Sequence, residues 1–149
     1  MPRRFLAIDL GDKRTGLAVG DAVSGIVTPV AVIVATVPAE RLRRLLAAIA
    51  EHEPQAIVVG LPLNMDGTAG PAAQSATAIA QALRQACALP VHLFDERLTS
   101  YAADRQMART GLTHKRKRER RDALAAATIL RDFFAAREAG GSGDPSEPT

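Results

Sequence analysis

The fold follows from the stretch Phe5-Leu-Ala-Ile-Asp-Leu-Gly-Asp-Lys-Arg-Thr-Gly-Leu-Ala-Val19. A run of strand-forming apolar residues carries one carboxylate, Asp9, breaks at Gly11 into a charged turn, and resumes as a second apolar run. A carboxylate in an apolar strand is costly unless it is paired or binds a cation. Asp9 is therefore either a cation ligand or a turn residue that caps the backbone after Gly11, and this stretch alone leaves both readings open.

The apolar runs predict strands, and the first two are antiparallel neighbours because a tight turn joins them. Pro29 places the third strand at a sheet edge or at a bulge. The fourth is fully apolar, as buried parallel strands are. The predicted strands cover 4–10, 15–20, 25–34, 56–60 and 91–94.

Helical periodicity follows the third strand, and Arg41, Arg43 and Arg44 are expected near the polar face of the first helix. Thr68 is expected to cap the second helix. The predicted helices cover 38–53, 68–86, from Thr99 or Ser100 to Arg109, and 119–137.

This order of elements predicts an RNase H-like α/β fold. The expected sheet is mixed and five-stranded, with three antiparallel strands and then parallel strands, flanked by helices. A doubly wound dinucleotide fold would need helices between its first strands, and none is predicted there. We expect one domain over 1–138 and a disordered Gly/Ser/Pro/Glu tail over 139–149.

Composition narrows the class of protein. At 149 residues with 47% hydrophobic content, the chain is of ordinary size and composition for one globular domain. It has no tryptophan and one tyrosine, which argues against base-stacking platforms, so nucleic-acid contacts are expected mainly to the backbone. One cysteine excludes an internal disulfide and a cysteine-built zinc site. With no signal peptide or membrane-spanning run, we expect a cytoplasmic protein.

Two more carboxylates resemble Asp9 in their placement. Glu96 follows the strand 91–94 at its carboxyl end, where open α/β sheets collect ligands, although Asp95 on the other face is an equal candidate by periodicity. Asp122 heads the apolar face of the last predicted helix. If the three carboxylates converge, they form an all-oxygen site that suits Mg²⁺ or Mn²⁺. Ions of this kind support phosphodiester hydrolysis. The alternative for Glu96 is an ordinary charged loop after a strand. The alternative for Asp122 is a first-turn aspartate stabilised by the helix dipole.

Four stretches, in this order, carry a resemblance to a known family: Asp9-Leu-Gly-Asp-Lys-Arg-Thr-Gly-Leu-Ala-Val19, Val59-Gly-Leu-Pro-Leu-Asn-Met-Asp-Gly-Thr68, Asp95-Glu-Arg-Leu-Thr-Ser100 and Asp122-Ala-Leu-Ala-Ala-Ala-Thr-Ile-Leu130. Together they resemble the YqgF/RuvX family, the Holliday-junction-resolvase-like proteins described as pre-16S rRNA nucleases. The resemblance runs from residue 4 to about 135. One departure is Gly20, where the family often has serine.

The resemblance implies an RNase H-like fold with an acidic triad of Asp9, Glu96 and Asp122. It also implies metal-dependent endonucleolytic cleavage of a ribosomal RNA precursor in ribosome biogenesis, with branched DNA as an older suggestion. We therefore expect structured pre-ribosomal RNA or branched DNA as the partner, no membrane, and a monomer or homodimer.

Basic and polar residues near the three carboxylates are the expected phosphate contacts, with plain surface charge or a tight connection as the alternative for each. The run His114-Lys-Arg-Lys-Arg-Glu-Arg-Arg121 is the densest positive segment and stands directly ahead of Asp122. His114 could donate a proton to a leaving oxygen, although a lone loop histidine is more often inert. The residues predicted to bind nucleic acid are Lys13, Arg14, Asn64, Arg97, Lys115, Arg116, Lys117 and Arg118.

Two other functions are compatible with the sequence. An RNA- or ribosome-associated binding factor without nuclease activity would use the basic run and would not need a metal. A sugar-kinase-like ATPase would use the range 9–16 as a phosphate loop. Such ATPases close two domains over the nucleotide, whereas this chain has room for one.

Overall fold

The computed structural model describes residues 1–98 and 114–140, without the side chains of residue 98 and residues 114–122. The strands are β1 (Arg4–Leu10), β2 (Arg14–Asp21), β3 (Val27–Val34), β4 (Ala56–Leu61) and β5 (Val91–Asp95). The helices are α1 (Pro38–His52), α2 (Pro71–Ala86) and α4 (His114–Glu138), with a short 3-10 helix, η1, at Glu96–Leu98. The predicted helix ending at Arg109 lies outside the described residues, as does the predicted tail over 139–149 from residue 141 onward.

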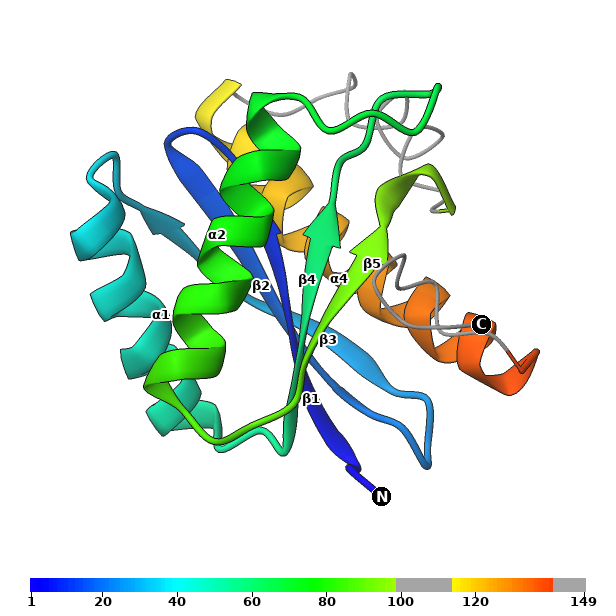
Figure 1. Ribbon diagram of the computed structural model, residues 1–149. Coiled ribbons are helices and arrows are strands. Elements are labelled where there is room, and N and C mark those ends of the chain that lie inside the picture. Colours follow the sequence, from blue (N-terminus) through cyan, green and yellow to red (C-terminus); the bar gives the residue numbers. More distant parts are fainter. Residues whose placement is uncertain (99–113, 141–149) are drawn as a thin grey trace.

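The five strands form one sheet in the order β3-β2-β1-β4-β5 (Figure 1). β1 pairs antiparallel with β2 and β2 antiparallel with β3, whereas β4 is parallel to both β1 and β5. The predicted mixed sheet is thereby confirmed. β3 is an edge strand as Pro29 predicted, and its register with β2 shifts between Leu17 and Ala18, opposite that proline.

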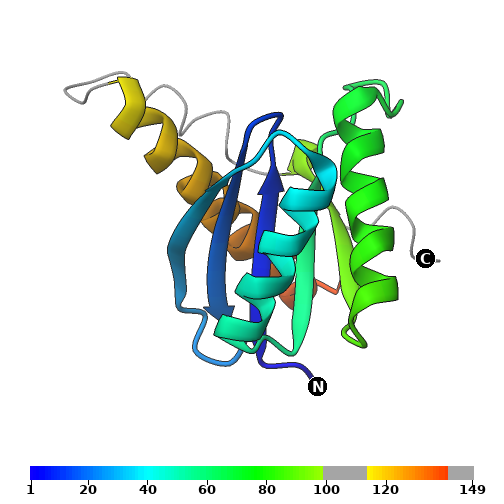
Figure 2. The ribbon, with the colours of Figure 1, turned by 90° about the vertical axis from the view of Figure 1, so that its left-hand side faces the viewer.

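Helices cover both faces of the sheet (Figure 2). One core lies between the sheet and the pair α1 and α2, where Leu45 and Leu83 are fully buried. A second core lies between the sheet and α4, where Phe94 and Phe133 meet edge to face with ring centroids 5.9 Å apart. β4 is buried along its whole length because it has helices on both sides, which explains its uninterrupted apolar sequence.

Small residues bring α4 close to the sheet. Its buried face begins with three alanines, 125–127, and two strand glycines lie beneath it. A Cβ built on Gly20 would lie 2.7 Å from Leu130 Cδ2, and one on Gly60 would lie 2.7 Å from Ile129 Cδ1. The predicted close approach of this helix is confirmed. It also gives the departure at Gly20 a physical context, since a side chain there would press on α4.

Three local predictions were wrong. α2 begins at Pro71 with Gly70 as its N-cap, while Thr68 bonds within the preceding loop to Asp66. α4 begins at His114 rather than near residue 119, because lysine and arginine are good helix formers and extend the helix beyond its apolar face. Arg41 is buried instead of lying near the polar face of α1.

None of the helices in the described part of the chain is long and apolar enough to cross a membrane.

Candidate active site

Asp9 lies near the carboxyl end of β1, between two glycines on the neighbouring strands. In β2 its partner is Gly16. On the other side the parallel pairing with β4 ends at Ile8 and Val59, so Asp9 and Gly60 are the residues that directly follow the last pair. Phe5 and Ala7 of β1 belong to the core under α4, and side chains alternate along a strand. Asp9 therefore faces the α4 side of the sheet.

Glu96 reaches the same place from a different strand. It opens η1 directly after β5, and its carboxylate lies over β4. A Cβ built on Gly60 would be 3.0 Å from Glu96 Oε1. Because Asp9 and Gly60 lie on adjacent strands, about 4.8 Å apart in a sheet, the two carboxylates flank one glycine. Asp95 occupies the opposite face, so the choice between Asp95 and Glu96 that periodicity left open falls on Glu96.

Gly16 and Gly60 were not among the residues predicted from the sequence. Both lie within strands on the α4 face, one on each side of Asp9, and neither brings a side chain into the space beside the carboxylate. An isolated glycine inside a strand pattern often marks a close approach of another group. That signal was present in both strands and would have located the floor of this site.

Asp122 belongs to α4 and stands three and four positions before the buried Ala125 and Ala126. Its side chain lies outside the described residues, as do those of His114, Lys115, Arg116, Lys117 and Arg118. Among the side chains described, no group of three or more His, Cys, Asp or Glu could hold a metal ion. Convergence of Asp9, Glu96 and Asp122 is thus a prediction, because the side chain of Asp122 is not described.

Arg97 is tied to Asp95 rather than left free at the surface. Its Nη2 donates to Asp95 Oδ2 at 2.6 Å and its Nε to both carboxylate oxygens at 3.1 Å. Burial raises the pKa of Asp95, but the hydrogen bonds from Arg97 outweigh it and hold the pKa below its ordinary value. Arg97 Nη1 also lies 3.4 Å from the carbonyl of Met65. The pair therefore fastens the loop after β4 to the end of β5.

That loop closes on itself around Asn64. The Asn64 side chain donates to Thr68 Oγ1 at 2.9 Å, and Thr68 in turn donates through its hydroxyl to Asp66 Oδ1 at 2.6 Å. Bonds from Thr68 lower the pKa of Asp66, helped by the charge of Arg97. Asn64 is exposed, so it is accessible to a substrate, and its contact with nucleic acid stays a prediction.

The turn between β1 and β2 presents the other two predicted contacts. Lys13 is exposed and Arg14 is half-buried, and both follow Asp9 within five residues. The Gly11 N–H donates to the Arg14 carbonyl at 2.9 Å and closes the turn. Two cations therefore lie in the turn that follows the strand end carrying Asp9. Their contact with phosphate stays a prediction.

Replacing Asp95 by asparagine should make the stability less dependent on pH. The folded pKa of Asp95 lies below its unfolded value, so its contribution is complete above the unfolded pKa and is lost as the pH falls through the folded one. We expect Asp95→Asn to cost about 1.5–3 kcal/mol near neutral pH, the scale of a hydrogen bond to a charged group. The difference from wild type should shrink below about pH 4. Urea unfolding across pH measures it, and a difference that does not change with pH would contradict the assignment.

Known proteins resemble this chain over nearly its whole length. The family model described as "RuvX: Holliday junction resolvase" matches residues 3–136. A "Putative pre-16S rRNA nuclease" of Anaeromyxobacter sp. (strain K) is 42% identical over 131 residues, covering 88% of this chain and 96% of that protein. A protein of Opitutus terrae with the same name is 46% identical over 132 residues, covering 88% and 90%.

The solved structures support the fold independently. "T. thermophilus RuvC in complex with Holliday junction substrate" superimposes with a TM-score of 0.61 over 94% of this chain and 98% of that chain, at 16% sequence identity. At that identity the likeness concerns the fold alone, and it confirms the RNase H-like architecture expected from the strand order. With a family model covering the four motifs and relatives above 40% identity, the chain belongs to the RuvX family.

Proposed function

We propose that this chain is a divalent-metal-dependent endonuclease that hydrolyses phosphodiester bonds of pre-16S ribosomal RNA in the cytoplasm. The supporting observation is the pair Asp9 and Glu96, which come from different strands and flank Gly60 on one face of the sheet. The names of the relatives point to the same substrate.

The donor set fits a hard cation. Asp9 and Glu96 offer only oxygen, and Asp122 would add a third carboxylate from α4. Gly16 on β2 and Gly60 on β4 bring no side chain of their own against Asp9, and the carboxylate of Glu96 lies close over Gly60. These three residues would hold Mg²⁺ or Mn²⁺. Such an ion supplies charge stabilisation to the phosphoryl group and activates the attacking water.

The chain's own cations would hold the RNA. Lys13 and Arg14 leave the turn next to Asp9, and the first turns of α4 carry the densest basic sequence. Cations of this kind neutralise phosphates with little sequence preference and with a marked salt dependence. Three of the four phenylalanine rings, those of Phe5, Phe94 and Phe133, are buried and cannot stack on a base, and Phe134 is half-buried. We expect recognition to depend mainly on RNA shape and backbone.

Purified chain incubated with a pre-16S rRNA transcript is expected to cleave it in Mg²⁺ or Mn²⁺ and to stop in EDTA. Product mapping on a sequencing gel gives the cleavage positions. Undiminished RNA binding without cleavage under any divalent ion would select the binding factor instead. Faster cleavage of a four-way DNA junction than of the transcript would select a resolvase.

A further inference from the structure

Arg41 is a buried guanidinium in the first turn of a surface helix. Its neighbours Arg43 and Arg44 are exposed and both bond to Glu40. Arg41 is 9% exposed and, among the side chains that the structure describes, is paired with no carboxylate. Its Nε is buried without a hydrogen-bond partner. An apolar side chain would fill this position without that desolvation cost, so the retained charge calls for an explanation.

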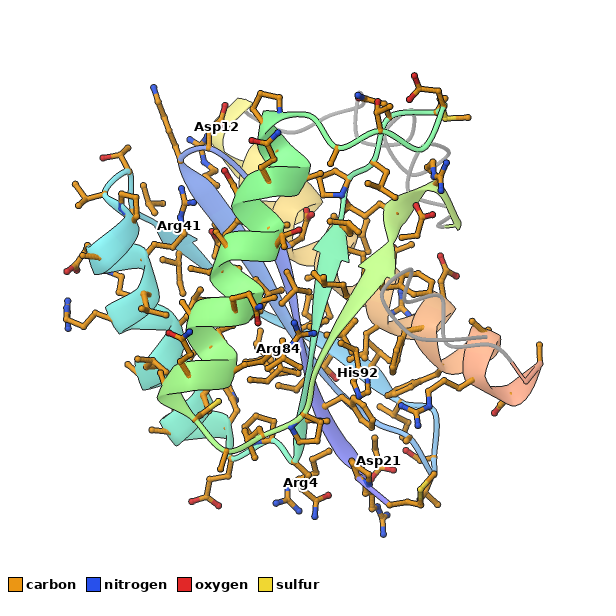
Figure 3. The ribbon with its side chains drawn as sticks, in the orientation of Figure 1. Arg4, Asp12, Asp21, Arg41, Arg84 and His92 are labelled. Atoms are coloured by element: carbon orange, nitrogen blue, oxygen red, sulfur yellow. The ribbon has the colours of Figure 1, made fainter. Side chains whose placement is uncertain are left out.

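The bonds of Arg41 go to the backbone around the turn that follows Asp9. Figure 3 shows Arg41 on α1 below the turn that carries Asp12. The Arg41 Nη2 donates to the carbonyl of Asp12 and, at 3.2 Å, to the carbonyl of Ala35. The Ala35 N–H in turn donates to the Lys13 carbonyl at 2.9 Å. The guanidinium thus joins the helix α1, the segment after β3 and the turn between β1 and β2.

The consequence is a turn in which three successive backbone carbonyls are hydrogen-bonded within the protein. Three consecutive carbonyls, those of Asp12, Lys13 and Arg14, accept bonds from Arg41, from Ala35 and from Gly11 respectively. A backbone fixed in this way gives the Lys13 and Arg14 side chains a defined origin next to Asp9. Arg41 supplies the only side-chain bond of the three.

We propose that Arg41 is a positioning residue that holds this turn so that Lys13 and Arg14 meet the substrate phosphates. This inference rests on the proposed nuclease function. It separates two roles within the site, since Arg41 acts on the phosphate-binding turn and not on Asp9 or Glu96. Its loss should therefore weaken substrate binding more than the chemical step.

The test compares Arg41→Met and Arg41→Lys with Arg43→Ala, an exposed arginine of the same helix that does not contact the turn. Loss of one hydrogen bond to a charged group corresponds to about a tenfold change. We expect Arg41→Met to raise KM for RNA by about that factor with kcat nearly unchanged, and Arg41→Lys to recover part of it. Arg43→Ala should match wild type.

Two further measurements separate positioning from plain destabilisation. Hydrogen exchange at the Ala35 amide, bonded to Lys13, should accelerate in Arg41→Met at a pH where the whole protein stays folded. In a Lys13→Ala/Arg14→Ala background, Arg41→Met should change KM little, because the groups it positions are gone. An equal KM increase in both backgrounds, or a parallel loss of kcat, overturns the proposal. Failure of the wild-type protein to cleave or bind RNA overturns the nuclease function. The hydrogen-exchange result still tests whether Arg41 holds the turn.

Discussion

Asparagine in place of Asp9 is expected to reduce RNA cleavage by about three orders of magnitude while leaving the fold and RNA affinity nearly intact. The substitution keeps the size of the side chain and removes the charge that would hold a divalent ion. Asp9 is only half-buried, and the strand around it is held by ladders to β2 and β4 that do not involve its side chain. The loss should therefore fall on catalysis.

The measurement is single-turnover cleavage of the transcript, with RNA binding measured separately in Ca²⁺. Glu51→Gln, which removes the same charge from an exposed position on α1, is the control and should cleave like wild type. Glu96→Gln should lose activity to a similar degree. The double variant should lose little more than either single one, because the two carboxylates would act on one ion. Cleavage by Asp9→Asn at the wild-type rate would end the metal-site hypothesis.

The sequence predicted the sheet well, since strand order and pairing depend on patterns that local chemistry imposes. The turn after Asp9 forces β1 and β2 together, and Pro29 excludes β3 from a central position. The predicted N-cap of α2 was wrong because several residues that can cap a helix stand close together in this loop. Thr68 bonds to Asp66 instead of to the helix, so the start of α2 moves to Gly70 and Pro71.

The site itself stays a prediction. Asp9 and Glu96 could be proposed from the sequence because a carboxylate at the end of an apolar strand needs a reason, and that reasoning is local. The face of Glu96 required the register of β5 on β4, which periodicity does not contain. The prediction for Arg41 was wrong because helical spacing assumes that an arginine side chain lies in solvent. Here the guanidinium is buried and donates to the backbone carbonyls of Asp12 and Ala35.

Alanine in place of Gly60 is expected to lower cleavage by about a hundredfold, the scale of a misplaced catalytic group. The new Cβ would lie 3.0 Å from Glu96 Oε1 and 2.7 Å from Ile129 Cδ1. The Ile129 Cδ1 end must move, and the Glu96 carboxylate must give way by a few tenths of an ångström, which displaces it from its position over β4. Overpacking of this kind costs about 1–3 kcal/mol of stability, which urea unfolding would measure beside the single-turnover rate.

Two variants show which contact matters. Gly20→Ala makes a matched clash, 2.7 Å from Leu130 Cδ2, under the same helix but away from the carboxylates, and should lose stability and keep activity. Adding Ile129→Val to Gly60→Ala removes the Cδ1 atom and should recover stability without recovering cleavage, since the contact with Glu96 persists. If cleavage returns together with stability, the effect of Gly60 is exerted through the packing of α4. If only stability returns, the glycine is there to leave room for the Glu96 carboxylate.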